Sequence, residues 1–347
     1  MDPLTHFLTG ACIARTGLNR KTALATAVLT ISAEFADVDI FWDAAGPIYG
    51  LQHHRGWTHA FIGVPVVAAA SLALVLAVDK LWRWRRKPRH LPVRYDWLFG
   101  CALLGALVHL LLDFTNSYGL RPFLPFSYRW YHWDIVQIIE PLLLLFLSGG
   151  LVLPKLFSLI QEEIGAQRSR GRAGATVALV LVVLLWGVRD YEHRRAVALM
   201  SSLEYGEGLP VRLSAFPNAV TLFTWYGVVE NENTFVTFNV DTLEGEVDPQ
   251  RRARTYHKPR ETPASEVAKN SRLGHVYLDW ADYPLVETEP IISTGGFRVR
   301  FLDLRYMYPG RTTAPLGASE VLDKDLHILG VEMGGYFHAR RLRPASE

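Results

Sequence analysis

The sequence has little cysteine and little net charge, and each shortage excludes a class of protein. Its two cysteines, Cys12 and Cys101, lie inside apolar segments, where we expect them to pack as small hydrophobic residues. A disulfide framework and a thiolate metal site are therefore excluded. The formal net charge is only +2, and no basic patch alternates with aromatic residues, which excludes nucleic acid as a partner.

The N-terminus lacks the features of a cleavable signal peptide. Residues 1–6 have no basic n-region and carry an Asp and a His, so we expect them to belong to the mature fold. Internal repeats and long low-complexity tracts are also missing.

Long apolar runs, in contrast, are abundant in the first part of the chain. Half of the residues are apolar, yet the mean hydropathy is only +0.11, because the apolar residues concentrate before about residue 197. The segments apolar enough to enter a bilayer are residues 4–17, 21–42, 58–80, 96–114, 135–158 and 174–192. We therefore expect an α-helical membrane domain of five to six membrane helices in residues 1–197. The first segment is short, and it either crosses the membrane or enters it to half depth.

Basic residues gather in the loops at one end of these segments. Residues 82–94 contain six Lys or Arg residues and no acid. The basic residues of the two other loops at this end are Arg15, Arg20, Lys21, Arg168, Arg170 and Arg172. The positive-inside rule assigns all three loops to the cytoplasm, so the chain after residue 192 is expected to be extracytoplasmic.

Residues 205–347 show short alternating runs separated by turn residues, which is typical of half-buried strands. The runs are residues 219–229, 234–240, 275–278, 297–304 and 327–332. They predict a small β-rich soluble domain after the helices. Residues 248–270 are rich in Pro, Arg and Lys, and we expect a loop or a short irregular segment there.

Ionisable side chains collect at the other, outer end of the apolar segments. They are Asp2, His6, Glu34, Asp37, Asp39, His53, His54, His59, His109, Asp113, Asp134 and Glu140. Such groups are costly at the edge of a membrane, so a dozen at one depth indicates a functional site, and a metal ion is the expected occupant.

Two motifs carry most of this inference. His109 and Asp113 stand four residues apart, on one face of a helix. They are either two metal ligands or a ligand with its orienting carboxylate. The alternative is a hydrogen-bonded pair that only packs two helices together. Residues 53–59 hold three imidazoles and Arg55, which is suited to grip a phosphate or carboxylate; the alternative is a solvated His-rich loop.

The acids Glu34, Asp37 and Asp39 are poor choices for burial unless a cation neutralises them, although they would also mark the membrane boundary. Asn116 and Arg121 either donate to an anionic group or belong to loop structure.

These motifs together form a recognisable signature. The runs 1–6, 37–39, 54–59 and 109–119, followed by residues 125–127, resemble the YdjM-type family of membrane-bound metal-dependent hydrolases over roughly residues 1–145. The resemblance implies a multi-pass protein of the bacterial inner (cytoplasmic) membrane with a divalent metal and a hydrolytic role. Two departures stand out: Ala36 replaces the Pro common before the paired aspartates, and Glu140 stands where Asp is expected.

The function predicted first is a metal-dependent hydrolase acting on an ester or phosphoester, with a site that opens at the outer leaflet. The expected metal ligands are His6, Asp37, Asp39, His54, His59, His109 and Asp113. Zinc is the first expectation, with manganese or iron if carboxylates dominate the shell. Glu34 or Asp39 would act as general base and Arg55 would hold the anionic part of the substrate. The depth of the site points to a lipid or lipid-linked substrate.

Two other functions stay open at this stage. The same carboxylates and imidazoles would serve a metal or proton-coupled transporter, although the inner halves of the apolar segments are almost free of such groups. Alternatively, the chain is a non-catalytic membrane anchor whose β-rich domain binds other proteins and whose metal is structural.

Overall fold

The computed structural model describes residues 1–82, 91–163, 171–205, 210–308, 315–334 and 339–341. The chain forms two compact units. The helical unit comprises Met1–Asp39, Arg55–Tyr191 and Ala219–Leu222, and the β unit comprises Ile40–His54, Glu192–Asn218 and Phe223–Glu347. Each unit is described by itself.

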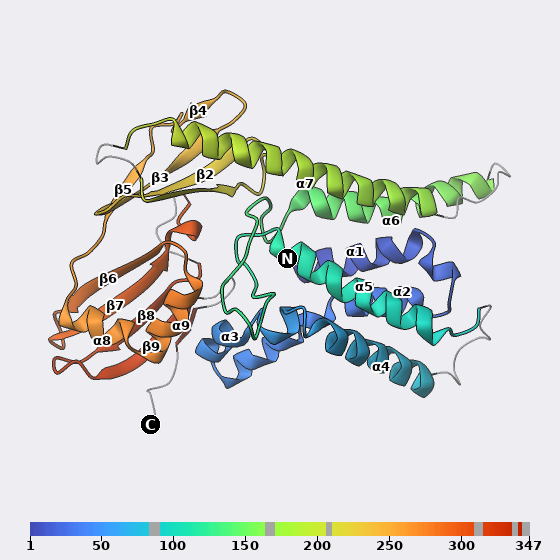
Figure 1. Cartoon of the computed structure of the whole chain (residues 1–347), viewed down its shortest axis with the longest axis horizontal. Helices are drawn as coiled ribbons and strands as arrows, with labels where there is room; N and C mark the ends of the chain where they lie inside the picture. Colours follow the sequence, from blue (N-terminus) through green and yellow to red (C-terminus); the bar gives the residue numbers. More distant parts are fainter. Residues whose placement is uncertain (83–90, 164–170, 206–209, 309–314, 335–338, 342–347) are drawn as a thin grey trace. The chain divides into compact units, whose positions relative to one another are not determined.

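The helices of the first 201 residues vary widely in length (Figure 1). The α-helices are α1 (Pro3–Arg15), α2 (Ala25–Ser32), α3 (Pro47–His53), α4 (Val64–Trp82), α5 (Tyr95–Phe114), α6 (Pro141–Glu163) and α7 (Arg172–Ser201). The 3-10 helices between them are η1 (Leu18–Arg20), η2 (Phe35–Ala45) and η3 (Trp57–His59).

Three of these helices, α4, α5 and α7, are long and apolar enough to cross a membrane, and α6 is apolar over the shorter stretch Pro141–Phe157. The prediction of five to six membrane helices is therefore not confirmed within the described residues. The predicted segment 21–42 is wrong as a continuous span, because it divides into a turn at residues 21–24, the 8-residue α2 and part of η2. Helix α1 has 13 residues, or about 20 Å at 1.5 Å per residue, which suits the half-depth alternative.

Close packing explains why the short α2 is stable. Gly10 of α1 lies against the backbone of α2, since a Cβ added there would lie 2.6 Å from the Leu29 carbonyl oxygen. Gly105 of α5 lies against α2 from another side, with its added Cβ 2.9 Å from the Ser32 Cβ. The Ser32 hydroxyl donates to the Ala102 carbonyl at 2.6 Å. Helix α2 is thus held between α1 and α5, and its C-terminal end leads directly to the acidic segment.

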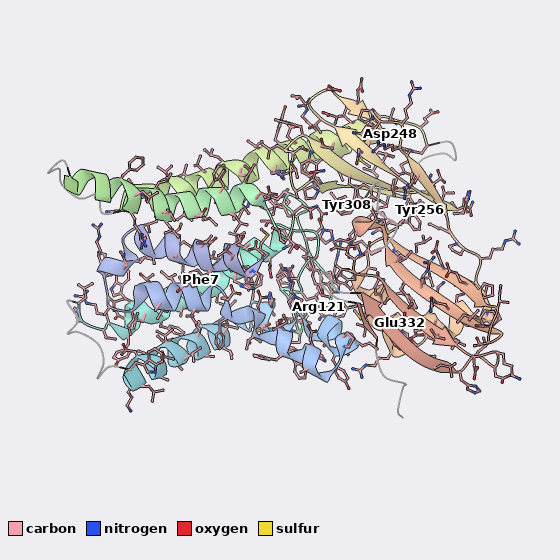
Figure 2. The ribbon with its side chains drawn as sticks, turned by 180° about the vertical axis from the view of Figure 1, so that it is seen from behind. Phe7, Arg121, Asp248, Tyr256, Tyr308 and Glu332 are labelled. Carbon is pink, nitrogen blue, oxygen red and sulfur yellow. The ribbon has the colours of Figure 1, made fainter. Side chains whose placement is uncertain are left out.

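Large apolar side chains face outward along the helices. Phe7 on α1 is 47% exposed (Figure 2). Other exposed apolar residues of the helices are Val66, Leu81, Leu145, Val183 and Leu184. A lipid environment accounts for this exposure, because apolar surfaces facing hydrocarbon carry no hydration cost. The orientation prediction partly rests on residues that lie outside the described part of the chain, namely residues 83–90, Arg168 and Arg170.

The β unit contains two antiparallel five-stranded sheets (Figure 1). The first has the order β1-β2-β3-β4 with β5 also paired to β3, and its strands are β1 (Arg212–Pro217), β2 (Thr224–Glu230), β3 (Thr234–Asp241), β4 (Glu246–Val247) and β5 (Arg254–His257). The second has the order β10-β9-β8-β7-β6, with β6 (Pro284–Ile291), β7 (Gly296–Asp303), β8 (Ala318–Leu322), β9 (Ile328–Gly334) and β10 (Ala339–Arg341). The prediction of a β-rich region after the helices is confirmed.

The two sheets share a buried aromatic core. Phe216 and Tyr226 of the first sheet pack with Tyr283, just before β6, and with Leu285 of β6. The Tyr226 hydroxyl donates to the Met307 carbonyl at 2.7 Å, just after the 3-10 helix η5 (Leu304–Tyr306). Burial partly alternates along β7, as in the sequence, whereas five consecutive residues of β2 are buried.

Two local predictions in this region are wrong. Residues 275–278 belong to helix α9 (Arg272–Trp280), because Ser271 caps its N-terminus and Leu273, Tyr277 and Trp280 bury one face at helical spacing. Residues 248–270, predicted as loop or irregular, contain β5 and helix α8 (Pro263–Lys269). A capping box between Thr262 and Ser265 starts α8, with Pro263 in its first turn.

Candidate metal centre

Four predicted ligands converge at one end of the helical unit. They are Asp37 of η2, His59 of η3, and His109 and Asp113 of α5, and one ligand atom from each lies within 4.8 Å of the others. His59, His109 and Asp113 are buried, and Asp37 is partly exposed. This grouping has the number and kinds of donor found at divalent metal sites.

Local structure delivers each of these side chains to the cluster. His109 and Asp113 share one face near the end of α5 because they are four residues apart. His59 ends the 3-10 helix η3, and Gly63, four residues further on, lies against the Trp57 carbonyl at the start of η3. A Cβ at Gly63 would lie only 2.0 Å from the Trp57 carbonyl oxygen, so this turn requires glycine.

Neighbouring oxygens fix how the two imidazoles are turned. His109 Nδ1 lies 2.7 Å from the Ala33 carbonyl oxygen, an acceptor, and therefore carries the proton. His59 Nδ1 lies 3.2 Å from Asp39 Oδ2 and 2.9 Å from Thr58 Oγ1. The Nε2 atoms of the two rings then face each other at 2.9 Å.

Asp39 contacts the site through His59. Its Oδ2 accepts hydrogen bonds from the Arg55 backbone N–H at 2.9 Å and from the Thr58 hydroxyl at 2.8 Å. A carboxylate on the second nitrogen of a histidine is the usual device that orients a metal ligand and raises its basicity. These contacts suit an orienting role for Asp39.

Asp113 lies between positive groups and imidazoles. Its Oδ1 accepts from Arg55 Nη2 at 2.8 Å and forms an ion pair with the amino group of Met1. Its Oδ2 lies 3.2 Å from His59 Nε2 and 3.4 Å from His109 Nε2. The carboxylate thus has one oxygen toward the imidazole pair.

Arg55 is held by several neighbours besides Asp113. Its Nη1 donates to Asn116 Oδ1 at 3.1 Å and to the Gly119 carbonyl at 3.2 Å, and its guanidinium lies 4.7 Å from the centre of the Tyr118 ring. Its φ of 54° is a strained value for a non-glycine residue, which fits a position fixed by its surroundings.

His6 also reaches the cluster. Its ring is buried and stacks on His109 at 3.9 Å between centroids, and its Nε2 lies 3.4 Å from Asp113 Oδ1. Among the described residues, neither ring nitrogen has a hydrogen-bond partner, and the same holds for Glu34 Oε2. Buried polar atoms are normally satisfied, so an unsatisfied set around two facing imidazoles fits a cation site.

Other residues of the predicted set make contacts of their own. Asp2 caps α1 by accepting from the Thr5 N–H, and His54 lies at the C-terminal end of α3 in the β unit. Glu140 forms a buried ion pair with Arg189 at 3.0 Å. Arg121, labelled in Figure 2, has its guanidinium 4.5 Å from the centre of the Trp130 ring.

Sequence reasoning missed two polar partnerships close to the predicted residues. Arg189 lies in the second half of α7, and only its charge at the end of the apolar run signals a buried partner. His132 Nδ1 lies 2.8 Å from Asp134 Oδ2, and the signal for this pair was their spacing of two residues in an extended segment.

Comparison with known proteins agrees with the resemblance seen in the sequence. The family model described as "YdjM inner membrane protein" matches residues 1–196, more than half of the chain. A Bacillus subtilis (strain 168) protein described as "Uncharacterized protein YfhP" is 25% identical over 353 residues, which cover 99% of this chain and 98% of that protein. No solved structure matches the chain. The chain belongs to the YdjM inner membrane protein family.

Proposed function

We propose that this protein is a membrane-bound, metal-dependent hydrolase that acts on an ester or phosphoester. The observation that carries the proposal is the convergence of His59 Nε2 and His109 Nε2 with the carboxylates of Asp37 and Asp113. His6 completes the donor set from α1. The mixture of imidazoles and carboxylates favours zinc, manganese or iron.

A divalent cation bound here would supply Lewis acidity and a water molecule that ionises near neutral pH. The chain's own residues then have distinct roles. Asp39 orients His59, and Arg55 fixes Asp113 through Oδ1. Glu34, whose Oε2 is buried without a hydrogen-bond partner among the described residues, is the proposed general base.

Arg55 is also the proposed anchor for the anionic part of the substrate. Both of its terminal nitrogens already donate to protein oxygens, whereas its buried Nε has no hydrogen-bond partner in the described part of the chain. One directed donor therefore remains beside the Asp113 carboxylate.

A lipid or lipid-linked substrate is proposed from the apolar residues around the centre. Phe61 and Ile62 stand two and three residues after His59, and both are exposed. Phe61 contacts Phe123 at 5.6 Å between ring centroids, and Phe126 nearby in the chain is 90% exposed. Aromatic residues at the end of membrane helices favour the headgroup region, where a lipid ester bond lies.

The site is proposed to open at the outer leaflet, with the C-terminal β-rich domain outside the cytoplasm. Arg15, Arg20 and Lys21 at the opposite end of the helices support this orientation by the positive-inside rule. The domain would cap the site or select partners.

Elemental analysis of the detergent-purified full chain tests the proposal, beside a His109→Ala/Asp113→Ala variant and a His275→Ala control on the exposed side of α9. Each protein is then assayed on phospho- and carboxyl-esters, lipid-linked ones included. We expect stoichiometric metal and metal-dependent turnover in the wild type and the control, and loss of both in the double variant. Metal without turnover would favour a structural site or transport, and a folded wild type without metal would refute the proposal.

A further inference from the structure

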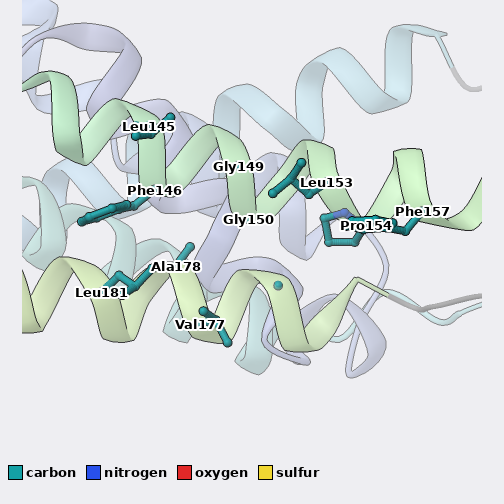
Figure 3. Close-up of a pocket in the computed structure, with 11 residues that line it drawn as sticks. Leu145, Phe146, Gly149, Gly150, Leu153, Pro154, Phe157, Val177, Ala178 and Leu181 are labelled. Atoms are coloured by element: carbon teal, nitrogen blue, oxygen red, sulfur yellow. The ribbon is translucent and has the colours of Figure 1, made fainter.

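A second feature of the helical unit lies away from the metal centre, between α6 and α7. A pocket of about 520 Å³ runs along these two helices (Figure 3). All the residues that line it are glycine, proline or apolar, among them Leu145, Leu153, Phe157 and Val177. A water-filled hollow with such walls would be unfavourable, so hydrocarbon is its natural content in a bilayer.

Glycines create the pocket by bringing the helices together at one level and leaving space at another. A Cβ at Gly150 would lie 2.5 Å from the Ala178 Cβ, and one at Gly174 would lie 2.4 Å from Pro154 Cγ, so the helices touch there. At Gly149 the nearest atom is Leu153 Cδ1 at 3.8 Å. The missing side chain of Gly149 therefore leaves room that no neighbouring residue fills.

Two arginines lie near the Pro154 end of the pocket. A Cβ at Gly171, just before α7, would lie 3.7 Å from the Pro154 Cβ and 3.9 Å from Arg15 Nη1. A Cβ at Gly17, just after α1, would lie 3.8 Å from the Cζ of Arg172. The guanidinium of Arg15 thus packs against the turn before α7, and that of Arg172 packs against the turn after α1.

Neither guanidinium has an acidic partner among the described residues. In the part of the chain that the structure describes, the ion pairs involve neither Arg15 nor Arg172. Arg172 is exposed and Arg15 is partly exposed. Two unpaired guanidinium groups beside an apolar groove match an anionic headgroup above a hydrocarbon chain.

We propose that this groove binds an anionic phospholipid, with an acyl chain between α6 and α7 and its phosphate at Arg15 and Arg172. Charge complementarity favours a lipid over an apolar helix of another protein, which would leave both arginines without a counter-ion. By the positive-inside assignment, the lipid belongs to the cytoplasmic leaflet. This inference is independent of the proposed hydrolase activity.

The test measures lipid retention by the full chain with native mass spectrometry after addition of dioleoylphosphatidylglycerol or dioleoylphosphatidylcholine. We expect the wild type to retain the anionic lipid several-fold more than the zwitterionic one. Arg15→Gln/Arg172→Gln is expected to lose this preference, and Gly149→Phe, which fills the groove, is expected to reduce retention of the anionic lipid several-fold. Arg20→Gln, in the same turn, is the matched control and should behave as the wild type.

Thermal unfolding of the same proteins separates binding from misfolding. The wild type and the Arg20→Gln control should gain thermal stability with the anionic lipid, and the folded Arg15→Gln/Arg172→Gln and Gly149→Phe variants should not. Equal retention of the two lipids by the wild type, or an unchanged preference in the arginine variant, would overturn the proposal. Binding of glycerol 1-phosphate that matches the whole lipid in strength would also overturn it, because the groove would then contribute nothing.

Discussion

The Nε2 atoms of His59 and His109 lie 2.9 Å apart. Each ring has its Nδ1 directed at an oxygen that accepts a hydrogen bond, Asp39 for His59 and the Ala33 carbonyl for His109. Two neutral rings protonated at Nδ1 would point lone pairs at each other, which is repulsive. A shared proton or a metal ion between or beside the rings would remove this repulsion.

Replacing Asp39 with Asn tests how far that orientation matters. The amide keeps the size of the side chain but loses the charge that raises the basicity of His59, so metal affinity should fall about 10- to 100-fold. Zinc titration against a competing chelator measures the change. Asp96→Asn, an exposed change at the opposite end of α5, should leave affinity unaltered, and an unaltered Asp39→Asn affinity would show that this carboxylate does not orient a ligand.

Arg55→Ala should destabilise the metal-free protein more than the metal-loaded one. Removing the guanidinium leaves the buried Asp113 carboxylate with one fewer positive partner, and breaking a buried pair costs about 3–5 kcal/mol. A bound cation would restore part of the lost charge balance. Thermal unfolding in detergent with and without zinc measures both states, and an equal loss in the two would argue against a metal near Asp113.

The sequence predicted those parts of the centre that depend on short spacing. His109 and Asp113 share a helical face whatever the rest of the fold does, and α5 has the expected position. The family membership predicted from residues 1–6, 37–39, 54–59 and 109–119 is confirmed. Spacing alone did not reveal that Arg55 contacts Asn116 and Gly119, because those contacts depend on how two loops meet.

Elements that depend on long-range packing were predicted less well. The hydropathy of residues 21–42 suggested one span, yet Gly10 and Gly105 enclose a short α2 and the chain turns into η2 instead. In the β unit, a four-residue alternation at 275–278 was outweighed by the cap at Ser271 and by a helical apolar face. Alternating polarity is a weak signal for a strand when the run is shorter than about one and a half turns of a helix.

Glu320 makes the stability of the β unit depend on pH. Burial raises the pKa of this carboxyl to about 7, while its hydrogen bond from the Ser271 hydroxyl at 2.7 Å acts in the opposite direction. The folded state therefore holds the proton between the ordinary value of 4.5 and about 7, where the unfolded state has lost it. Stability should fall as pH rises through this window and stay lower above it.

Glu320→Gln should remove that slope and raise the melting temperature at pH 8 relative to the wild type. Differential scanning fluorimetry of the full chain between pH 5 and pH 8 measures it. Glu244→Gln, at an exposed turn between β3 and β4, is the control. A melting temperature that changes between pH 5 and pH 8 by the same amount in all three proteins would contradict the assignment to Glu320.

The buried pair between Glu140 and Arg189 should behave as a unit in mutagenesis. Arg189 Nη2 donates to both carboxylate oxygens at 3.0 and 3.1 Å, and both side chains are fully buried. Arg189→Met or Glu140→Leu alone would leave an uncompensated buried charge, at a cost of about 3–5 kcal/mol. The double variant removes both charges and should recover much of that loss, because two apolar side chains suit a site inside the helical unit. Thermal unfolding of the four proteins gives the coupling; additive losses would mean that the two residues stabilise the fold through separate contacts.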